Sequence, residues 1–217
     1  MSTTNVARME RQAFCAALMQ AGPQAPTLCE GWLTRDLAAH VVVREARPDL
    51  AGGILVPALA SRLAAGQRAI AEGDWTALVE RVRTGPPVWN PARLPFLDDL
   101  VNLVEFTVHT EDVVRGAGGD TPGPRRDVPA DVTAAVWRAL GRSGRLLLRR
   151  SPVPVTLVAP DFGEFRAGRG SGTGVTLTGA PIELLLTAYG RDRAADTAWT
   201  GDASAIEELR GAPLGLV

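Results

Sequence analysis

Two histidines and one glutamate are the residues of this chain best suited to metal chemistry. His40 and His109 are the only histidines among 217 residues. Glu105 precedes His109 by four positions, which on a helix puts carboxylate and imidazole on one face about one turn apart. Two histidines with one carboxylate suit zinc with an open fourth position. The same set suits non-haem Fe(II), and Ni(II) and Mn(II) are further alternatives.

Apolar neighbours predict that these side chains point into a protein interior. Val101 and Val108 flank Glu105 on its helical face, so the carboxylate borders an apolar stripe. A helical pattern also surrounds His40, formed by Leu33, Leu37, His40, Val41 and Arg44. A buried carboxylate is costly to ionise alone, and a cation would offset that cost. The spacing also permits an ordinary helix pair for Glu105–His109 and a buried core histidine at position 40.

The elements that must position these residues are mainly helices. Apolar periodicity and the Gly and Pro positions predict helices over 3–21, 34–46, 54–72, 75–84, 95–115 and 130–149. Long helices with short connections are typical of an antiparallel bundle. After Arg150, short alternating segments predict strands at 153–158, 162–167, 174–178 and Trp199-Thr200, with helices at 181–189 and 202–210. We therefore expect an α+β fold, with a helix bundle over 1–150 and a small α/β domain over 151–217.

Composition limits the classes of partner. The formal charge is −1, with 23 arginines, no lysine and 24 acids, so nucleic acid is not an expected partner. No apolar run approaches the roughly 18 residues of a membrane span, and the N-terminus has no signal-peptide pattern. Two cysteines cannot form a disulfide framework, which favours a reducing cytoplasm. A small-molecule substrate is expected, and both a monomer and a homodimer are compatible with the sequence.

Two motifs carry a family resemblance. Residues 27–40 read TLCEGWLTRDLAAH, and residues 105–112 read EFTVHTED. The first resembles the T-x-C-x-G-W-x-x-x-D-L-x-x-H signature of the actinobacterial mycothiol-dependent maleylpyruvate isomerase-like proteins, and the second resembles their E-x-x-x-H-x-x-D signature. These proteins belong to the DinB/YfiT-like four-helix-bundle superfamily. Segments 177–181, 190–191 and 201–202 resemble the small C-terminal domain of the family, and the chain is most similar to a subgroup of actinobacterial metal-binding proteins.

The resemblance implies a metal centre and a thiol co-substrate. It assigns His40, Glu105 and His109 as ligands of one divalent cation, usually zinc. It implies mycothiol as co-substrate, with isomerase or S-transferase chemistry on a small electrophile. A metal with an open position lowers the pKa of a bound thiol or water, so a hydrolase is also compatible with the site. A non-catalytic metal-binding or stress-response protein is the alternative, in which a protein ligand such as Cys29 or Asp112 fills the fourth position.

Further residues are assigned supporting roles. We expect Asp112 to assist catalysis by holding a ligand imidazole or by pairing with Arg44. Arg44 is one turn from His40 and is expected to bind the cofactor, and the resemblance implies that Arg191 grips a substrate carboxylate. Cys29 is expected to be a buried structural residue and Trp32 a core residue. A stripe of arginines could hold an anion or form a solvated face; its members are Arg138, Arg142, Arg145 and Arg149. The glycines over 168–174 are interpreted as a turn, because the pattern lacks the lysine of a phosphate loop.

Overall fold

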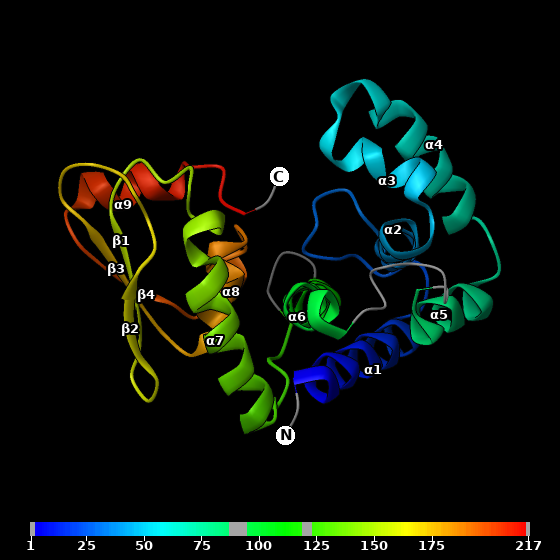
Figure 1. Cartoon of the computed structure of the whole chain (residues 1–217), viewed down its shortest axis with the longest axis horizontal. Coiled ribbons are helices and arrows are strands. Elements are labelled where there is room, and N and C mark those ends of the chain that lie inside the picture. Colours follow the sequence, from blue (N-terminus) through cyan, green and yellow to red (C-terminus); the bar gives the residue numbers. More distant parts are fainter. Residues whose placement is uncertain (1–2, 87–94, 119–122, 216–217) are drawn as a thin grey trace. The chain divides into compact units, whose positions relative to one another are not determined.

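The computed structural model describes residues 3–86, 95–118 and 123–215, and its chain divides into two compact units (Figure 1). These units are Met1–Arg126 and Asp127–Val217. The division differs from the expected boundary at residue 150, because the helix that begins at Ala130 packs with the C-terminal elements. An amphipathic helix pattern indicates an apolar face but does not indicate which core that face joins.

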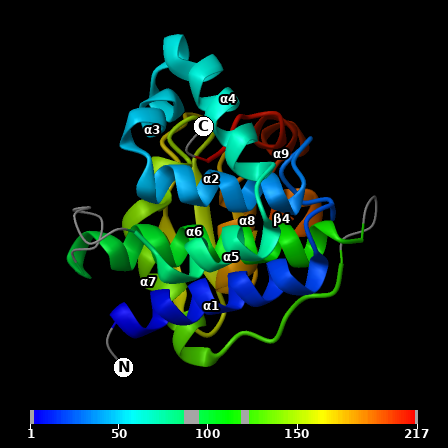
Figure 2. The same cartoon turned by 90° about the vertical axis from the view of Figure 1, so that its right-hand side faces the viewer.

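The N-terminal unit is helical. Its elements are α1 (Thr3–Ala21), α2 (Thr34–Ala46), α3 (Pro48–Leu55), the short 3-10 helix η1 (Pro57–Leu59), α4 (Ala60–Ala71), α5 (Trp75–Thr84) and α6 (Pro95–Gly116). Four helices, α1, α2, α5 and α6, contribute to one buried core, which contains Phe14, Leu37, Val79 and Phe106. Figure 2 shows these helices stacked side by side. The core of the N-terminal unit is therefore built by four helices, as expected.

The single helix expected over 54–72 is wrong. The chain instead forms α3, η1 and α4 across this region, and α3 begins at Pro48. Pro57 has no backbone N–H to continue a helix, while a proline in the first turn, as at position 48, is well tolerated. Gly53 permits the resulting tight corner, because a Cβ there would lie 2.8 Å from the carbonyl oxygen of Leu59.

The C-terminal unit combines helices with a small mixed sheet. Its elements are α7 (Ala130–Leu147), β1 (Val155–Ala159), β2 (Gly163–Arg166), β3 (Val175–Thr178), α8 (Pro181–Ala188), the 3-10 helix η3 (Asp192–Ala194), β4 (Ala198–Thr200) and α9 (Ala203–Arg210). The strand order is β2-β1-β3-β4, with β1 and β3 parallel and the other pairs antiparallel. Alternate residues of β1 are buried, so one face of the sheet meets the core.

Aromatic packing attaches α7 to this sheet. The rings of Trp137 on α7 and Phe165 on β2 have centroids 4.8 Å apart. Gly144 leaves room for Phe165, since an added Cβ would lie 3.1 Å from its ring. The α+β fold class expected from the sequence is confirmed. None of the described helices has both the length and the apolar character needed to cross a membrane.

Candidate metal centre

The loop between α1 and α2 is fastened to α6 and positions two of the motif side chains. Leu28 N–H donates to the Asp112 carbonyl at 3.0 Å. Gly116 permits close contact, because a Cβ there would lie 2.4 Å from Thr27 Cα. Thr27 Oγ1 in turn donates to the Trp32 carbonyl at 2.9 Å. The turn needs a left-handed backbone at Gly31, where φ is 75°, a conformation that favours glycine.

Helix α2 begins directly after this loop. Asp36 accepts a hydrogen bond from the backbone N–H of Leu33 at 3.0 Å, which satisfies a donor at the start of the helix. One turn later, the ring of His40 contacts Trp32, with centroids 5.2 Å apart. Leu37 is buried in the core beside them. The first motif therefore has a physical role at its threonine, glycine, tryptophan, aspartate and histidine positions.

Helices α2 and α6 bring the three predicted ligands together. His40 comes from α2, and Glu105 and His109 lie one turn apart on α6. One ligating atom from each of the three residues lies within 4.8 Å of the others. His109 Nε2 and Glu105 Oε2 are 3.5 Å apart. Adjacent ligand atoms around tetrahedral zinc are separated by roughly 3.4 Å, so this pair already has a suitable spacing.

The second ring nitrogen of His109 is held by Asp112. Asp112 Oδ2 lies 3.0 Å from Nδ1, and an ionised carboxylate only accepts, so Nδ1 carries the proton. In the neutral imidazole the lone pair then belongs to Nε2. That atom is buried and has no hydrogen-bond partner among the described residues. A divalent cation would satisfy this nitrogen, so the residues fit a metal site.

The electrostatics of the three ligands differ. Burial and, to a smaller extent, the charge of His109 lower the pKa of His40 to about 4, so this imidazole is neutral at pH 7. Burial opposes ionisation of Glu105, but the neighbouring His109 and the charge of Arg44 outweigh it and lower the pKa of Glu105 to about 2. Burial also opposes the charged form of His109, but the Asp112 carboxylate at Nδ1 and the negative charge of Glu105 outweigh it and raise the pKa of His109 well above the usual value. Without a metal, His109 therefore carries a proton on each ring nitrogen, and a cation at Nε2 would displace the proton there.

Arg44 completes the charged surroundings of Glu105. Its Nη1 lies 3.9 Å from Glu105 Oε2, and its Nη2 donates to Asn102 Oδ1 at 2.7 Å. Its Nε is buried and has no hydrogen-bond partner in the described ranges. Of the two roles considered for Asp112, contact with a ligand imidazole is the one observed, while Arg44 contacts Glu105, Glu45 and Asn102. Asn102 was not anticipated, although it shares the α6 face of Glu105 three residues earlier.

Cys29 also has a polar partner that the sequence did not suggest. Its Sγ donates to Asp112 Oδ2 at 3.3 Å. Cys29, His109 and Asp112 form a second group whose possible ligand atoms lie within 4.8 Å of one another. The two groups share His109, but Asp112 binds Nδ1 whereas Glu105 faces Nε2. The two ring nitrogens point in different directions and cannot bind the same cation. The two groups are therefore two different candidate metal sites.

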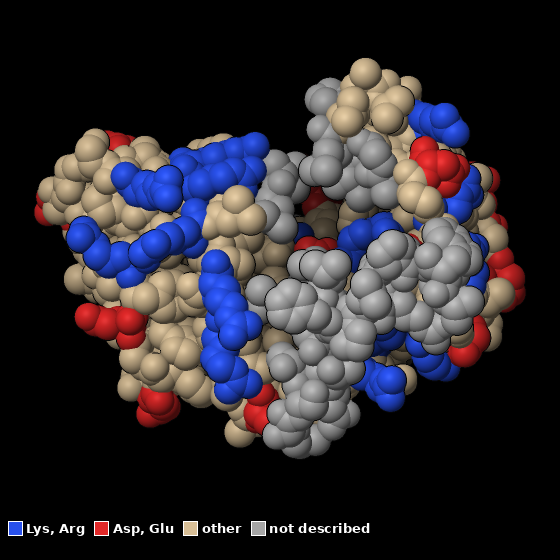
Figure 3. All heavy atoms as spheres, in the orientation of Figure 1, with Lys and Arg blue, Asp and Glu red and all other residues tan. Residues whose placement is uncertain are grey.

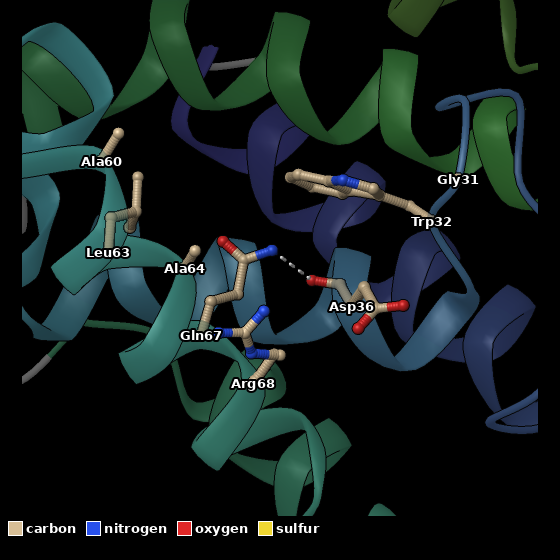
Figure 4. Close-up of a pocket in the computed structure, with 8 residues that line it drawn as sticks. All are labelled: Gly31, Trp32, Asp36, Ala60, Leu63, Ala64, Gln67 and Arg68. Carbon is tan, nitrogen blue, oxygen red and sulfur yellow. Dashed lines mark hydrogen bonds between the residues drawn. The ribbon is translucent and has the colours of Figure 1, made fainter. Parts of the chain in front are cut away.

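A pocket lies next to the ring that contacts His40. It has a volume of about 360 Å³, and its lining consists of Gly31, Trp32, Asp36, Ala60, Leu63, Ala64, Gln67 and Arg68. Figure 4 shows Trp32 facing the α4 side chains, and Gln67 donating to the Asp36 carbonyl, at 3.3 Å. Its walls combine small apolar side chains with charged groups, as in many sites for small molecules. Trp32 is therefore half-buried: it packs against the helical core on one side and also borders the pocket.

Arg191 belongs to the C-terminal unit. It follows Gly190, which ends α8 with a left-handed backbone at φ 76°. Its Nη1 donates to the Tyr189 carbonyl at 2.6 Å. The expected grip on a substrate carboxylate stays a prediction.

The fold and the candidate centre together define an α+β protein whose helical unit presents two histidines and a carboxylate from two helices. A solved structure of the mycothiol-dependent maleylpyruvate isomerase has this fold, with a TM-score of 0.57, 14% identity and coverage of 91% of each chain. A variant of that enzyme with a histidine replaced by alanine matches with a TM-score of 0.58, 13% identity and coverage of 90% of this chain and 91% of that one. No family model matches the sequence, and no curated protein matches it significantly. The comparison confirms the fold that the two motifs led us to expect.

Proposed function

We propose that this protein is a metal-dependent enzyme that uses a low-molecular-weight thiol to transform a small electrophile. The observation that carries the proposal is the buried His109 Nε2, which lacks a hydrogen-bond partner in the described residues and faces Glu105 in a cluster with His40. The shared fold with a mycothiol-dependent isomerase supports mycothiol as the thiol. We also propose a cytoplasmic location, where the reducing environment keeps such a thiol in its free form.

The chain's own residues would hold the cation and order the reactants. When bound, the cation would lower the pKa of a thiol or water ligand toward neutrality. His40, Glu105 and His109 are the proposed ligands, with zinc favoured and nickel, iron and manganese as alternatives. Asp112 keeps the proton on His109 Nδ1, which leaves Nε2 free to ligate. The partly buried guanidinium of Arg44 would orient an anionic group near Glu105, and Arg191 is proposed to grip a carboxylate.

The thiolate chemistry fits two reaction classes. In an isomerisation, the sulfur forms a bond to an activated C=C carbon while the π electrons move onto the conjugated carbonyl. Rotation about the new single bond follows, and the reverse electron flow expels the thiolate and restores the double bond. In an S-transfer, the sulfur forms the same kind of bond and a leaving group departs with its electron pair. We propose isomerase or S-transferase activity on this basis.

The second group of possible ligands bears on the non-catalytic alternative. That alternative requires Cys29 or Asp112 to close the fourth position of the cation. Asp112 Oδ2 is instead engaged with His109 Nδ1, and Cys29 Sγ donates to the same oxygen. Asp112 is therefore held at the Nδ1 side of the ring and Cys29 is held by Asp112, so these contacts direct neither group toward a cation at Nε2. This arrangement favours an open position and hence an enzyme.

The pocket beside Trp32 suits the non-reacting part of the co-substrate or electrophile. Trp32 lines this pocket and also contacts His40, and Asp36, a second lining residue, lies on the same helix as His40. The pocket therefore borders the proposed centre. Its apolar α4 side supplies contact area, and its Asp36, Gln67 and Arg68 groups supply polar contacts. Binding energy from such remote contacts orients the reacting atoms.

The proposal is tested by metal content and thiol binding together. His40→Ala and Glu105→Gln should lose zinc by elemental analysis, while Cys29→Ser should keep it, because only the first two belong to the proposed ligand set. Calorimetry with mycothiol should give heat with the zinc-loaded protein and none with the metal-free protein. Full zinc occupancy in His40→Ala would reject the ligand assignment. Equal mycothiol heats with and without zinc would reject the metal-dependent thiol chemistry.

A further inference from the structure

A cleft in the C-terminal unit is lined by three arginines. It has a volume of about 310 Å³, and its lining consists of Arg145, Pro154, Arg166, Ala167, Gly168, Arg169 and Gly170. Arg145 lies near the end of α7, Arg166 is the last residue of β2, and Arg169 follows on the next loop. The end of α7 and the stretch from Arg166 to Arg169 therefore place three arginines at one hollow.

The loop that carries Arg169 is packed tightly onto the start of β1. Ala167 N–H and Gly168 N–H both donate to the Val155 carbonyl, at 2.8 and 3.3 Å. A Cβ on Gly168 would lie 2.8 Å from Val155 N, and one on Gly170 would lie 2.2 Å from the Pro152 backbone. The glycines thus allow a backbone contact that fixes the base of the Arg169 side chain. This accounts for the glycine pattern without a phosphate loop.

The three guanidinium groups have no carboxylate partner in the part of the chain that the structure describes. Residues 127–217 contain ten arginines and ten acids, so the unit has no net charge. Seven of these arginines, but only two of the acids, lie between positions 138 and 169. Figure 3 shows arginine side chains gathered over the unit, and within the described residues Arg145, Arg166 and Arg169 form no ion pair. Like charges placed together repel, and an anion between them would remove that repulsion.

We propose that this cleft binds a compact small-molecule polyanion that carries phosphate or carboxylate groups. Arginine presents a planar fork of N–H donors that matches both groups bidentately. Among the described residues no aromatic side chain lines the cleft, so it lacks the aromatic stacking platform that is typical of single-stranded nucleic-acid sites. The volume suits a ligand at the small end of the usual range. This site uses no residue of the proposed metal centre and is independent of it.

The test uses the full-length protein and two probes, pyrophosphate and citrate, each titrated by calorimetry at low ionic strength. At least one probe should bind, and Arg145→Gln, Arg166→Gln and Arg169→Gln should each weaken it about tenfold, the loss of one charge-assisted contact. Arg166→Lys should also weaken binding, because lysine keeps the charge but lacks the fork. The identity of the tighter probe distinguishes a phosphate ligand from a carboxylate ligand.

Two matched controls separate the cleft from a diffuse positive field. Arg138→Gln removes the same charge two turns earlier on α7, and Arg193→Gln removes it on η3; each should change affinity less than twofold. Binding of neither probe would overturn the proposal, and so would equal losses in Arg138→Gln and Arg166→Gln. Tighter binding of a single-stranded RNA ten-mer than of either probe, weakened equally by all these variants, would overturn it as well.

Discussion

Zinc binding at the proposed centre should release one proton, and that proton should come from His109. Three ligands must be deprotonated to bind a metal. Glu105, with its pKa at about 2, and His40, with its pKa at about 4, have already lost theirs at neutral pH. The pKa of His109 is raised well above its usual value, so zinc must displace the proton on Nε2, while the proton on Nδ1 stays with Asp112. Lowering the pH therefore makes protons compete with zinc at a single group.

The magnitude follows from this count. With one competing proton, the apparent dissociation constant for zinc rises about tenfold from pH 7 to pH 6, which corresponds to about 1.4 kcal/mol. Chelator competition at several pH values measures the slope. Calorimetry in two buffers with different ionisation enthalpies measures the proton count directly. Cys29→Ser is the control and should keep a slope of one proton, because the thiol is not a ligand in this centre.

Two results would refute the reasoning. A hundredfold change in the dissociation constant per pH unit would mean that zinc displaces two protons. That result is expected if the Cys29 thiol or a charged His40 also had to lose a proton. A dissociation constant independent of pH between 6 and 7 would mean that His109 is neutral in the metal-free protein or does not bind the metal.

Three further variants test the surroundings of the centre. Asp112→Asn should weaken zinc binding by about 10- to 100-fold in chelator competition, because the amide no longer supplies the charge that orients the ligand imidazole; unchanged affinity would contradict that role. Ala64→Leu should fill the pocket and reduce turnover while the zinc content stays the same. Ala65 is not among the lining residues, so Ala65→Leu should leave turnover unchanged. Equal effects of the two substitutions would exclude the pocket from catalysis. Gly31→Ala should lower the free energy of unfolding by about 1–2 kcal/mol in urea titrations, because φ is 75° at this position. Gly211→Ala is the control and should leave the free energy of unfolding nearly unchanged, because φ is −77° there. Equal stability of the two variants would contradict the strain argument.

Local spacing was enough to predict which residues of one helix share a face. Glu105, His109 and Asp112 lie on α6 as their i, i+4 and i+7 positions require, and the apolar pattern around His40 directed it inward. The meeting of α2 with α6 is a tertiary contact, and no periodicity within either helix encodes it. The family resemblance supplied that pairing in the sequence-based prediction.

The role of Cys29 illustrates what local patterns omit. Its thiol meets Asp112 because the loop from α1 to α2 is fastened onto α6, which lies more than 80 positions away in sequence. The same limitation applies to α7, whose amphipathic pattern predicted a helix but not its membership of the C-terminal unit. The break at Pro57 differs from these cases, since the missing N–H of proline was readable from the sequence.

X-ray absorption spectroscopy of the zinc-loaded protein in solution would show which atoms surround the cation. The proposed set of His40, Glu105 and His109 predicts a shell of nitrogen and oxygen neighbours only, at about 2.0–2.2 Å, with two imidazole signatures. A sulfur neighbour at about 2.3 Å, or a single imidazole, would place the cation with Cys29 and Asp112 and would contradict the account.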